Sequence, residues 1–282
     1  MARQTIITAD STCDLSSGLL ERFHIRTVPL TITLGEESFL DGEHFTPDDM
    51  YRRYRADGTL PTTSAPGYQQ YTEFFAGLVE TGAEVVHLTI SSELSASYNN
   101  ARLAAEALEG VYVVDSRMLS TGVGLLAIEG AEERDRGLGA AEIAENLRAL
   151  TGKVQTSFVL DTLEYMRKGG RCSGVTAFGA NLLHIKPALM MKDGKLQVYK
   201  KYRGSIEHVY RQYIAEHLAD KRVRGGHVFI TDSGEVPRET LDELERLVRE
   251  SIEVRELHHT LAGCTVSSHC GPKTLGILFI EE

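Results

Sequence analysis

The stretch IITADS at residues 6–11 is an apolar, β-branched run that ends in an aspartate and a serine. The same pattern recurs as VYVVDS at residues 111–116 and as VFITDS at residues 228–233. Aspartate and serine cap helices and form Asx turns, and such capping is enough to explain any single copy. Taken together, the three copies mark the carboxyl ends of strands, where open α/β sheets bind their ligands.

Outward from these stretches, short apolar runs alternate with longer helical segments, which predicts a mainly parallel sheet with helices on its faces. The predicted strands are residues 4–9, 26–34, 37–40, 85–90, 111–114, 154–160, 188–192, 196–200, 228–231, 253–257 and 276–280. The predicted helices are residues 16–23, a helix begun by Thr46 and Pro47, and residues 66–81, 95–108, 121–134, 140–150, 163–168, 175–183, 205–219 and 237–251.

The pattern shifts near residue 150, where strands begin to follow one another more closely. Asp193 and Gly194 between two strand runs predict a β-hairpin, and hence a mixed sheet in the second half. We therefore predict two α/β domains: residues 1–153 with a mainly parallel sheet, and residues 154–282 with a mixed sheet.

The bulk composition excludes several classes of protein. A chain of 282 residues with 30 Lys+Arg and 40 Asp+Glu has a net charge of −10, which argues against a primary nucleic-acid or anionic-membrane binder. Basic clusters at residues 167–171 and 200–203 are most simply read as solvated loops. The four cysteines follow no disulfide-scaffold spacing. With no signal-peptide pattern and no apolar run of about 20 residues, we expect a soluble, cytoplasmic protein.

Two hydroxyl-rich turns are the main candidates for a functional site. One is LPTTSAP at residues 60–66, and the other is ISSELSASY at residues 90–98. Each lies where an element ends and a helix begins, so hydroxyls and free backbone N–H groups gather there and favour an oxyanion. Helix capping alone would explain one isolated turn.

A third candidate is VSSHCGP at residues 266–272, whose Gly-Pro pair predicts a tight loop around His269. This histidine can donate a hydrogen bond to a carboxylate or titrate near neutral pH. A zinc site would have to combine His258, His259, Cys264, His269 and Cys270. Their spacing matches no finger or ribbon pattern, and adjacent residues are awkward ligands for one ion, so we predict no metal.

Signals for an enzyme are weak. The sequence has neither a GxSxG nucleophile elbow nor a GxxxxGK[ST] phosphate loop. A hydrolase or transferase that uses Ser95 or His269 on a lipid or phosphorylated substrate stays open as the alternative.

Several motifs, taken in order, resemble those of the DegV family. They are DSTCDL at residues 10–15, TSAP at 63–66, SSELSASY at 91–98, VDS at 114–116, LEYMRKGGR at 163–171, KP at 186–187 and HCGP at 269–272. Any one of them is weak, but seven in the family's order over almost the whole chain are specific.

The resemblance implies a two-domain α/β protein that binds one long-chain fatty acid in a tunnel between its domains. It implies a bacterial carrier without cofactor or chemistry of its own, whose bound carboxylate a separate fatty acid kinase phosphorylates for phospholipid synthesis. The residues implied to bind the carboxylate are Thr62 or Thr63, Ser95 and His269. Supporting positions are Ser64, Ser97 and Gly271, and candidate contacts with the kinase or a membrane surface are Arg171 and Arg203.

The chain departs from the family pattern at three places. Ala65 stands where the family often has glutamine, and Ala96 and Ser97 stand where it often has glycine and threonine. Lys273 replaces a final glycine and so bears on the shape and charge of the loop after His269. The hydroxyls that the carboxylate would need are retained.

Overall fold

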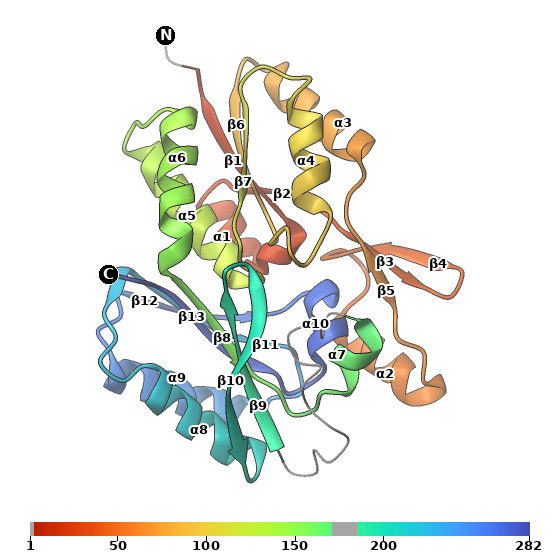
Figure 1. Ribbon diagram of the computed structural model, residues 1–282, viewed down its shortest axis with the longest axis vertical. Helices are drawn as coiled ribbons and strands as arrows, with labels where there is room; N and C mark the ends of the chain where they lie inside the picture. Colours follow the sequence, from red (N-terminus) through yellow and green to blue (C-terminus); the bar gives the residue numbers. More distant parts are fainter. Residues whose placement is uncertain (1–2, 171–184) are drawn as a thin grey trace.

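The computed structural model describes residues 3–170 and 185–282. Figure 1 shows one large sheet above another, with a small third sheet projecting to one side. Arg171 and the helix expected at residues 175–183 lie outside the described residues.

The first sheet contains four parallel strands in the order β2-β1-β6-β7. These are β1 (Thr5–Asp10), β2 (Arg26–Val28), β6 (Glu84–Thr89) and β7 (Val111–Asp115). Strands β1 and β6 are buried along nearly their whole length, as expected for parallel strands covered on both faces. The covering helices are α3 (Tyr68–Val79) and α4 (Ser97–Ala105) on one face, and α5 (Thr121–Asp135) and α6 (Ala140–Leu150) on the other. Helix α1 (Ser17–Arg22) follows β1.

The second sheet has six strands in the order β10-β9-β8-β13-β11-β12. These are β8 (Val154–Val159), β9 (Ile185–Lys192), β10 (Lys195–Arg203), β11 (Val223–Asp232), β12 (Glu256–Leu261) and β13 (Leu275–Glu281). Only the β11–β12 pairing among these strands is parallel, so the sheet is mixed, as predicted. Helices α8 (Ile206–His217) and α9 (Arg238–Ser251) pack on one of its faces.

Helix α5 lies between the two large sheets, in contact with β1 and β6 of the first and with β8, β11 and β13 of the second. Two of its glycines allow this close packing. A Cβ atom added to Gly124 would lie 2.8 Å from the carbonyl oxygen of Cys13, and one added to Gly122 would lie 2.2 Å from Oγ1 of Thr156. Because both sheets pack on α5, they share one hydrophobic core.

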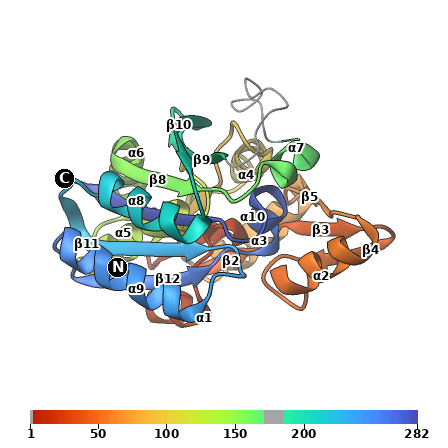
Figure 2. The ribbon, with the colours of Figure 1, turned by 90° about the horizontal axis from the view of Figure 1, so that it is seen from below.

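The small sheet corrects one prediction. It contains β3 (Thr31–Leu34), β4 (Glu37–Leu40) and β5 (Thr62–Ser64), all antiparallel. The single strand expected at residues 26–34 is in fact two strands in different sheets, because Pro29 between them has no N–H to donate and interrupts the ladder. The first predicted hydroxyl turn likewise contains the short strand β5. Figure 2 shows this sheet and α2 (Pro47–Asp57) at the opposite end of the molecule from α8 and α9.

Two local signals in the sequence are confirmed. Helix α2 begins with a capping box in which the Thr46 side chain accepts from the N–H of Asp49, and Asp49 accepts in return from the N–H of Thr46. The β9–β10 hairpin turns at Asp193 and Gly194, whose φ angles of 51° and 79° are the positive values that a tight hairpin turn requires.

The three strand-ending aspartates differ from one another. Asp115 and Asp232 each accept a hydrogen bond from the backbone N–H two residues further on, as expected of Asx turns. Asp10 is fully buried and instead accepts from the hydroxyl of Tyr71 at 2.6 Å and from the N–H of Ile90 at 3.0 Å. Its carboxylate therefore ties β1 to α3 and to the end of β6, so capping is the wrong explanation for this copy.

The tight loop expected at residues 266–272 is also wrong in part. Residues up to Cys270 form helix α10 (Cys264–Cys270), which packs against α7 (Glu164–Gly169). The helix ends at Gly271, whose φ of 78° favours glycine and whose added Cβ would lie 2.4 Å from the Tyr165 ring. The glycine therefore marks the end of a helix that the sequence pattern did not reveal.

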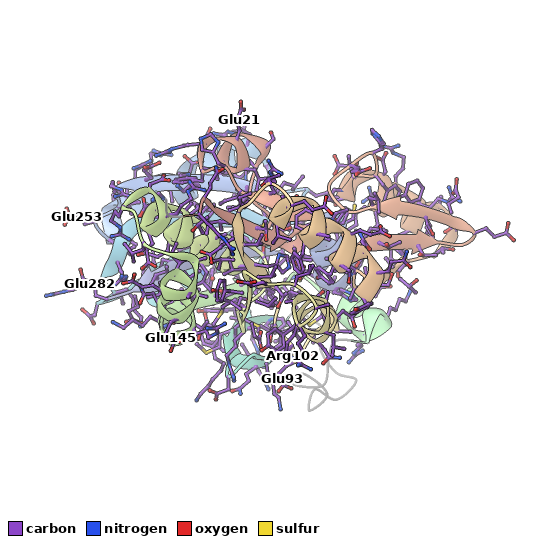
Figure 3. The ribbon with its side chains drawn as sticks, turned by 90° about the horizontal axis from the view of Figure 1, so that it is seen from above. Glu21, Glu93, Arg102, Glu145, Glu253 and Glu282 are labelled. Atoms are coloured by element: carbon purple, nitrogen blue, oxygen red, sulfur yellow. The ribbon has the colours of Figure 1, made fainter. Side chains whose placement is uncertain are left out.

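Charged side chains such as Glu21, Arg102 and Glu253 project from the periphery (Figure 3) and are exposed. Within residues 3–170 and 185–282, no helix has the length and apolar character needed to cross a bilayer. The boundary between residues 153 and 154 stays a prediction.

Candidate functional site

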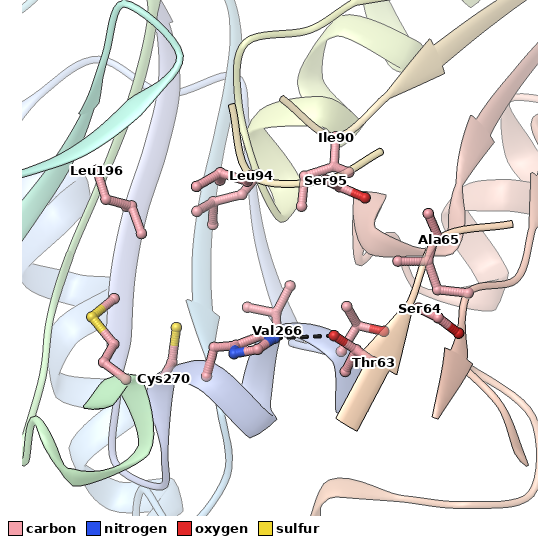
Figure 4. Close-up of a pocket in the computed structure, with 14 residues that line it drawn as sticks. Thr63, Ser64, Ala65, Ile90, Leu94, Ser95, Leu196, Val266 and Cys270 are labelled. Atoms are coloured by element: carbon pink, nitrogen blue, oxygen red, sulfur yellow. Dashed lines mark hydrogen bonds between the residues drawn. The ribbon is translucent and has the colours of Figure 1, made fainter. Parts of the chain in front are cut away.

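A cavity with about 560 Å³ of empty space lies where the small sheet, α10 and the loop after β6 meet. This volume includes space that is open to solvent, and we call this site the first cavity. Its lining residues are Leu30, Thr63, Ser64, Ala65, Ile90, Leu94, Ser95, Leu119, Met166, Leu196, Thr265, Val266, His269 and Cys270. Figure 4 shows Thr63, Ser64 and Ser95 on one side, facing Leu196 and Cys270 across the cavity.

Thr63 and His269 both line the first cavity and contact each other there. Thr63 Oγ1 lies 3.1 Å from Nε2 of His269, and Figure 4 marks this bond with a dashed line. Thr62 in the same strand is exposed and is not among the lining residues. Of the two threonines proposed from the sequence, the structure brings Thr63 to the cavity.

The imidazole of His269 is also constrained from the α7 side. A Cβ atom added to Gly169, the last residue of α7, would lie 2.2 Å from Nδ1 of His269. Only a residue without a side chain permits this close approach. In the sequence, Gly169 is marked only by its place at the end of a short predicted helix.

Ser95 lies in the loop between β6 and α4. Its Oγ is 3.0 Å from Oγ of Ser97 and accepts from the N–H of Ser97 at 3.2 Å. Ser97 is fully buried behind it, whereas Ser95 lines the cavity. The loop is held from two sides, because Ser91 Oγ donates to the carbonyl of Gly194 at 2.7 Å and Ser92 N–H donates to Asp115.

Most of the remaining lining residues are apolar. Within the described part of the chain, none of the lining residues is Asp, Glu, Lys or Arg. Burial raises the pKa of the Cys270 thiol to about 12, so this side chain is neutral at physiological pH and acts as a small apolar wall. Such a cavity suits a ligand that is mostly hydrocarbon.

A second, smaller cavity adjoins the first. The two share Leu119, Val266 and Cys270 as lining residues. Thr156 and Phe158 of β8 line the second cavity but not the first. It extends the space available to a ligand toward the second sheet.

The other predicted residues are placed as follows. Ser64 lines the first cavity, and Gly271 ends α10 beside it. Arg203 is exposed at the end of β10, and Arg171 lies outside the described residues. Lys273 adopts a φ of 57°, the left-handed conformation that glycine would adopt easily, and its carbonyl accepts from the Tyr210 hydroxyl.

The residues considered for zinc are not brought together. His258 lies 3.0 Å from His227, measured between ring nitrogens, whereas His259 is bonded to Asp232. Cys264 donates to the carbonyl of Phe45. Thr265, which no sequence motif marked as a candidate, also lines the first cavity, one helical turn before His269.

The fold and the cavity define an α/β protein with two large sheets and a mostly apolar cavity that is polar on one side. The model of a family described as "Uncharacterised protein, DegV family" matches residues 4–282. The chain therefore belongs to the DegV family.

Individual relatives are similar to this chain over nearly their full length. A DegV domain-containing protein of Clostridium perfringens is 31% identical over 98% of each chain. A fatty-acid-binding DegV family protein of Thermus thermophilus has a similar structure, with a TM-score of 0.89 and 28% identity over 99% of this chain and 100% of that one. A stearic-acid-binding protein of Eubacterium ventriosum is similar with a TM-score of 0.83 and 27% identity, over 100% of this chain and 98% of that one.

Proposed function

We propose that the protein binds one long-chain fatty acid, with the carboxylate toward the polar side of the first cavity and the tail along its apolar walls. The observation that carries this proposal is that Thr63, Ser95 and His269 line one cavity whose other lining residues are mostly apolar. The fatty-acid-binding relatives from Thermus thermophilus and Eubacterium ventriosum support the same class of ligand.

The energetics assign different tasks to the two ends of the ligand. Burying about a dozen methylenes at ~0.8 kcal/mol each gives about 10 kcal/mol of gross driving force before the cost of association. The tail therefore supplies most of the affinity, and the head group needs orientation more than strong attraction. Neutral hydroxyls meet that need, and they allow release more readily than an arginine clamp would.

Lipid extraction tests the proposal directly. Purified protein is denatured, and its organic extract is analysed by mass spectrometry; we expect a co-purifying long-chain fatty acid. Stripped protein should bind palmitic acid in a calorimetric titration. A clean extract together with no binding of fatty acids of any length would refute the proposed function.

Ser95→Ala tests the assignment of the head group. Loss of one hydrogen bond to the carboxylate should weaken palmitic acid binding about tenfold. The matched control is Ser92→Ala in the same loop, because Ser92 Oγ donates to Asp115 and does not line the cavity. Equal affinities of the two variants would remove Ser95 from the head-group site.

We further propose that the protein is a carrier that presents the bound carboxylate to a separate fatty acid kinase in the cytoplasm, for phospholipid synthesis. The exposed position of Arg203 supports its role as a contact with that kinase or with a membrane surface. The test combines the loaded protein, the kinase and ATP, and measures acyl-phosphate. Arg203→Glu should lower the rate while fatty acid binding is unchanged; an unchanged rate would exclude Arg203 from the contact.

The hydrolase alternative gains little support. A serine nucleophile needs a base within hydrogen-bond reach. Among the described residues, the hydroxyl of Ser95 bonds to Ser97, and Nε2 of His269 bonds to Thr63 instead. A serine-directed phosphonate probe should therefore leave Ser95 unlabelled.

A further inference from the structure

Thr265 is a cavity residue whose hydroxyl is bonded to no other group in the part of the chain that the structure describes. Its side chain lines the first cavity and the residue is only 5% exposed. Within residues 3–170 and 185–282, its Oγ1 atom is buried and has no hydrogen-bond partner. A buried hydroxyl without a partner is uncommon, because it loses its bonds to water and gains nothing in exchange.

The neighbouring hydroxyls of α10 behave differently. Ser267 Oγ donates to the carbonyl of Ala262 at 3.1 Å, and Ser268 Oγ donates to the carbonyl of Thr265 at 2.9 Å. Both serine hydroxyls therefore have a hydrogen-bond acceptor in the nearby backbone. Thr265 lies in the first turn of the helix, where the residue four positions earlier, Leu261, still belongs to β12.

The position of Thr265 places it near the polar side of the cavity. Residues four apart in a helix are neighbours on one face, so Thr265 lies beside His269, whose Nε2 is bonded to Thr63. The backbone of Thr265 is held in place, because its N–H donates to Asp41 at 3.2 Å. The hydroxyl is thus fixed on the cavity wall one turn from the imidazole.

We propose that Thr265 is a further ligand of the fatty acid head group, and that its Oγ1 donates a hydrogen bond to a carboxylate oxygen. This inference rests on the proposed function. The hydroxyls of Thr63 and Ser95 already have protein partners, whereas Thr265 gains its first partner from the ligand. The same neutral donor would serve an acyl-phosphate oxygen equally well.

Replacing the Thr265 hydroxyl by a methyl group should change the affinity for palmitic acid. The direction of the change depends on whether Thr265 faces the head group or the tail. If Thr265 faces the head group, Thr265→Val removes a donor and palmitic acid binding weakens about tenfold. If Thr265 faced the tail instead, the same change would remove a polar atom from an apolar wall, and binding would tighten. In either case the unliganded variant should melt at the same temperature as the unliganded wild-type protein or at a higher one, because an unsatisfied buried hydroxyl is lost.

The experiment measures palmitic acid affinity by calorimetry and the melting temperature of the stripped protein for four chains. We expect weaker binding by Thr265→Val, near-normal binding by Thr265→Ser, which keeps the hydroxyl, and unchanged binding by Ser267→Ala. Ser267→Ala is the matched control, because it removes an internally bonded hydroxyl of the same helix and should lower the melting temperature. If Thr265→Val does not fold, Thr265→Ala replaces it in the comparison with Thr265→Ser.

Unchanged or tighter binding by Thr265→Val would overturn the inference while wild-type binding leaves the proposed function intact. Equal weakening by Thr265→Val and Thr265→Ser would also overturn it, because the effect would then not depend on the hydroxyl. A wild-type chain that binds no fatty acid would refute the proposed function, and the inference would fall with it for that separate reason.

Discussion

His217 in α8 is a largely buried histidine, and burial lowers its pKa to about 4. Its Nε2 lies 2.8 Å from Ser157 Oγ; nearby Lys221 lowers the pKa further, and Glu281 opposes the shift. The folded pKa is below the unfolded value of 6.5, so the unfolded chain binds the proton first as the pH falls. The contribution of neutral His217 to the free energy of unfolding is therefore fully present above pH 6.5, and it is lost progressively as the pH falls toward 4.

We expect the free energy of unfolding to be about 2 kcal/mol lower at pH 5 than at pH 7.5 because of this one group. Urea unfolding at the two pH values measures it, with His217→Gln as the comparison. The variant removes the titration, so its loss between the two pH values should be smaller. An equal loss in both proteins would assign the acid sensitivity to other groups.

At the scale of single residues, the sequence located the hydroxyls and the histidine but not their geometry. Thr63, Ser64, Ser95 and His269 line one cavity, as the two turns and the HCGP motif suggested, and their role as ligands stays a prediction. Thr62 lies in the same short strand as Thr63 but is exposed and outside the cavity, which a predicted turn did not reveal. Thr265 was missed because the absence of a hydrogen-bond partner is a property of the folded structure alone.

Helix α5 provides a prediction at the scale of elements. Alanine normally stabilises an exposed helix interior by about 1 kcal/mol relative to glycine. At Gly124 the added Cβ would lie 2.7 Å from Cδ2 of Leu15 as well as close to the Cys13 carbonyl, so Gly124→Ala should destabilise the protein by about 2 kcal/mol. Urea unfolding measures the difference.

The control for this change is Gly77→Ala in α3, where an added Cβ meets nothing within 4 Å. It should raise the free energy of unfolding by several tenths of a kcal/mol. Destabilisation by both variants would indicate a general cost of alanine in these helices instead of a close approach at Gly124.

Elements were predicted well where capping and turn signals are local, as at Thr46 and at Asp193-Gly194. They were missed where distant residues decide the structure. The first turn of α10 is held by Asp14, which accepts from the N–H of Gly263, and by Asp41, which accepts from Thr265. Both carboxylates come from more than 200 positions earlier in the chain, so no window around α10 contains its capping signal.

At the scale of the whole molecule, the adjoining cavities predict how chain length is selected. Val266 lines both cavities, so Val266→Phe should narrow the passage between them. We expect affinity for octadecanoic acid to fall by at least tenfold more than affinity for dodecanoic acid, because only the longer tail needs the second cavity.

Calorimetric titration of both acids checks this expectation. Met166→Leu is the control, because Met166 lines the first cavity alone and the change nearly conserves volume. Equal losses for the two acids in Val266→Phe would show that the tail does not pass from one cavity to the other.

The alternation of strands and helices was sufficient to predict one parallel and one mixed sheet. It did not predict how the sheets are joined, because α5 is nearly uniform in burial and has no polar face for a periodic pattern to reveal. Its glycines were visible in the sequence, but their close contacts with Cys13 and Thr156 depend on tertiary packing.

The shared helix also has a consequence for folding. Because α5 contributes its residues to the core of both large sheets, a fragment that ended near residue 153 would leave the α5 surface that packs on β8, β11 and β13 open to water. The two halves are therefore expected to unfold together, in one cooperative transition, although each has its own sheet. Natural selection for the stability of one sheet therefore also acts on the other. For the same reason, a ligand that stabilises the junction between the sheets raises the stability of the entire chain by mass action.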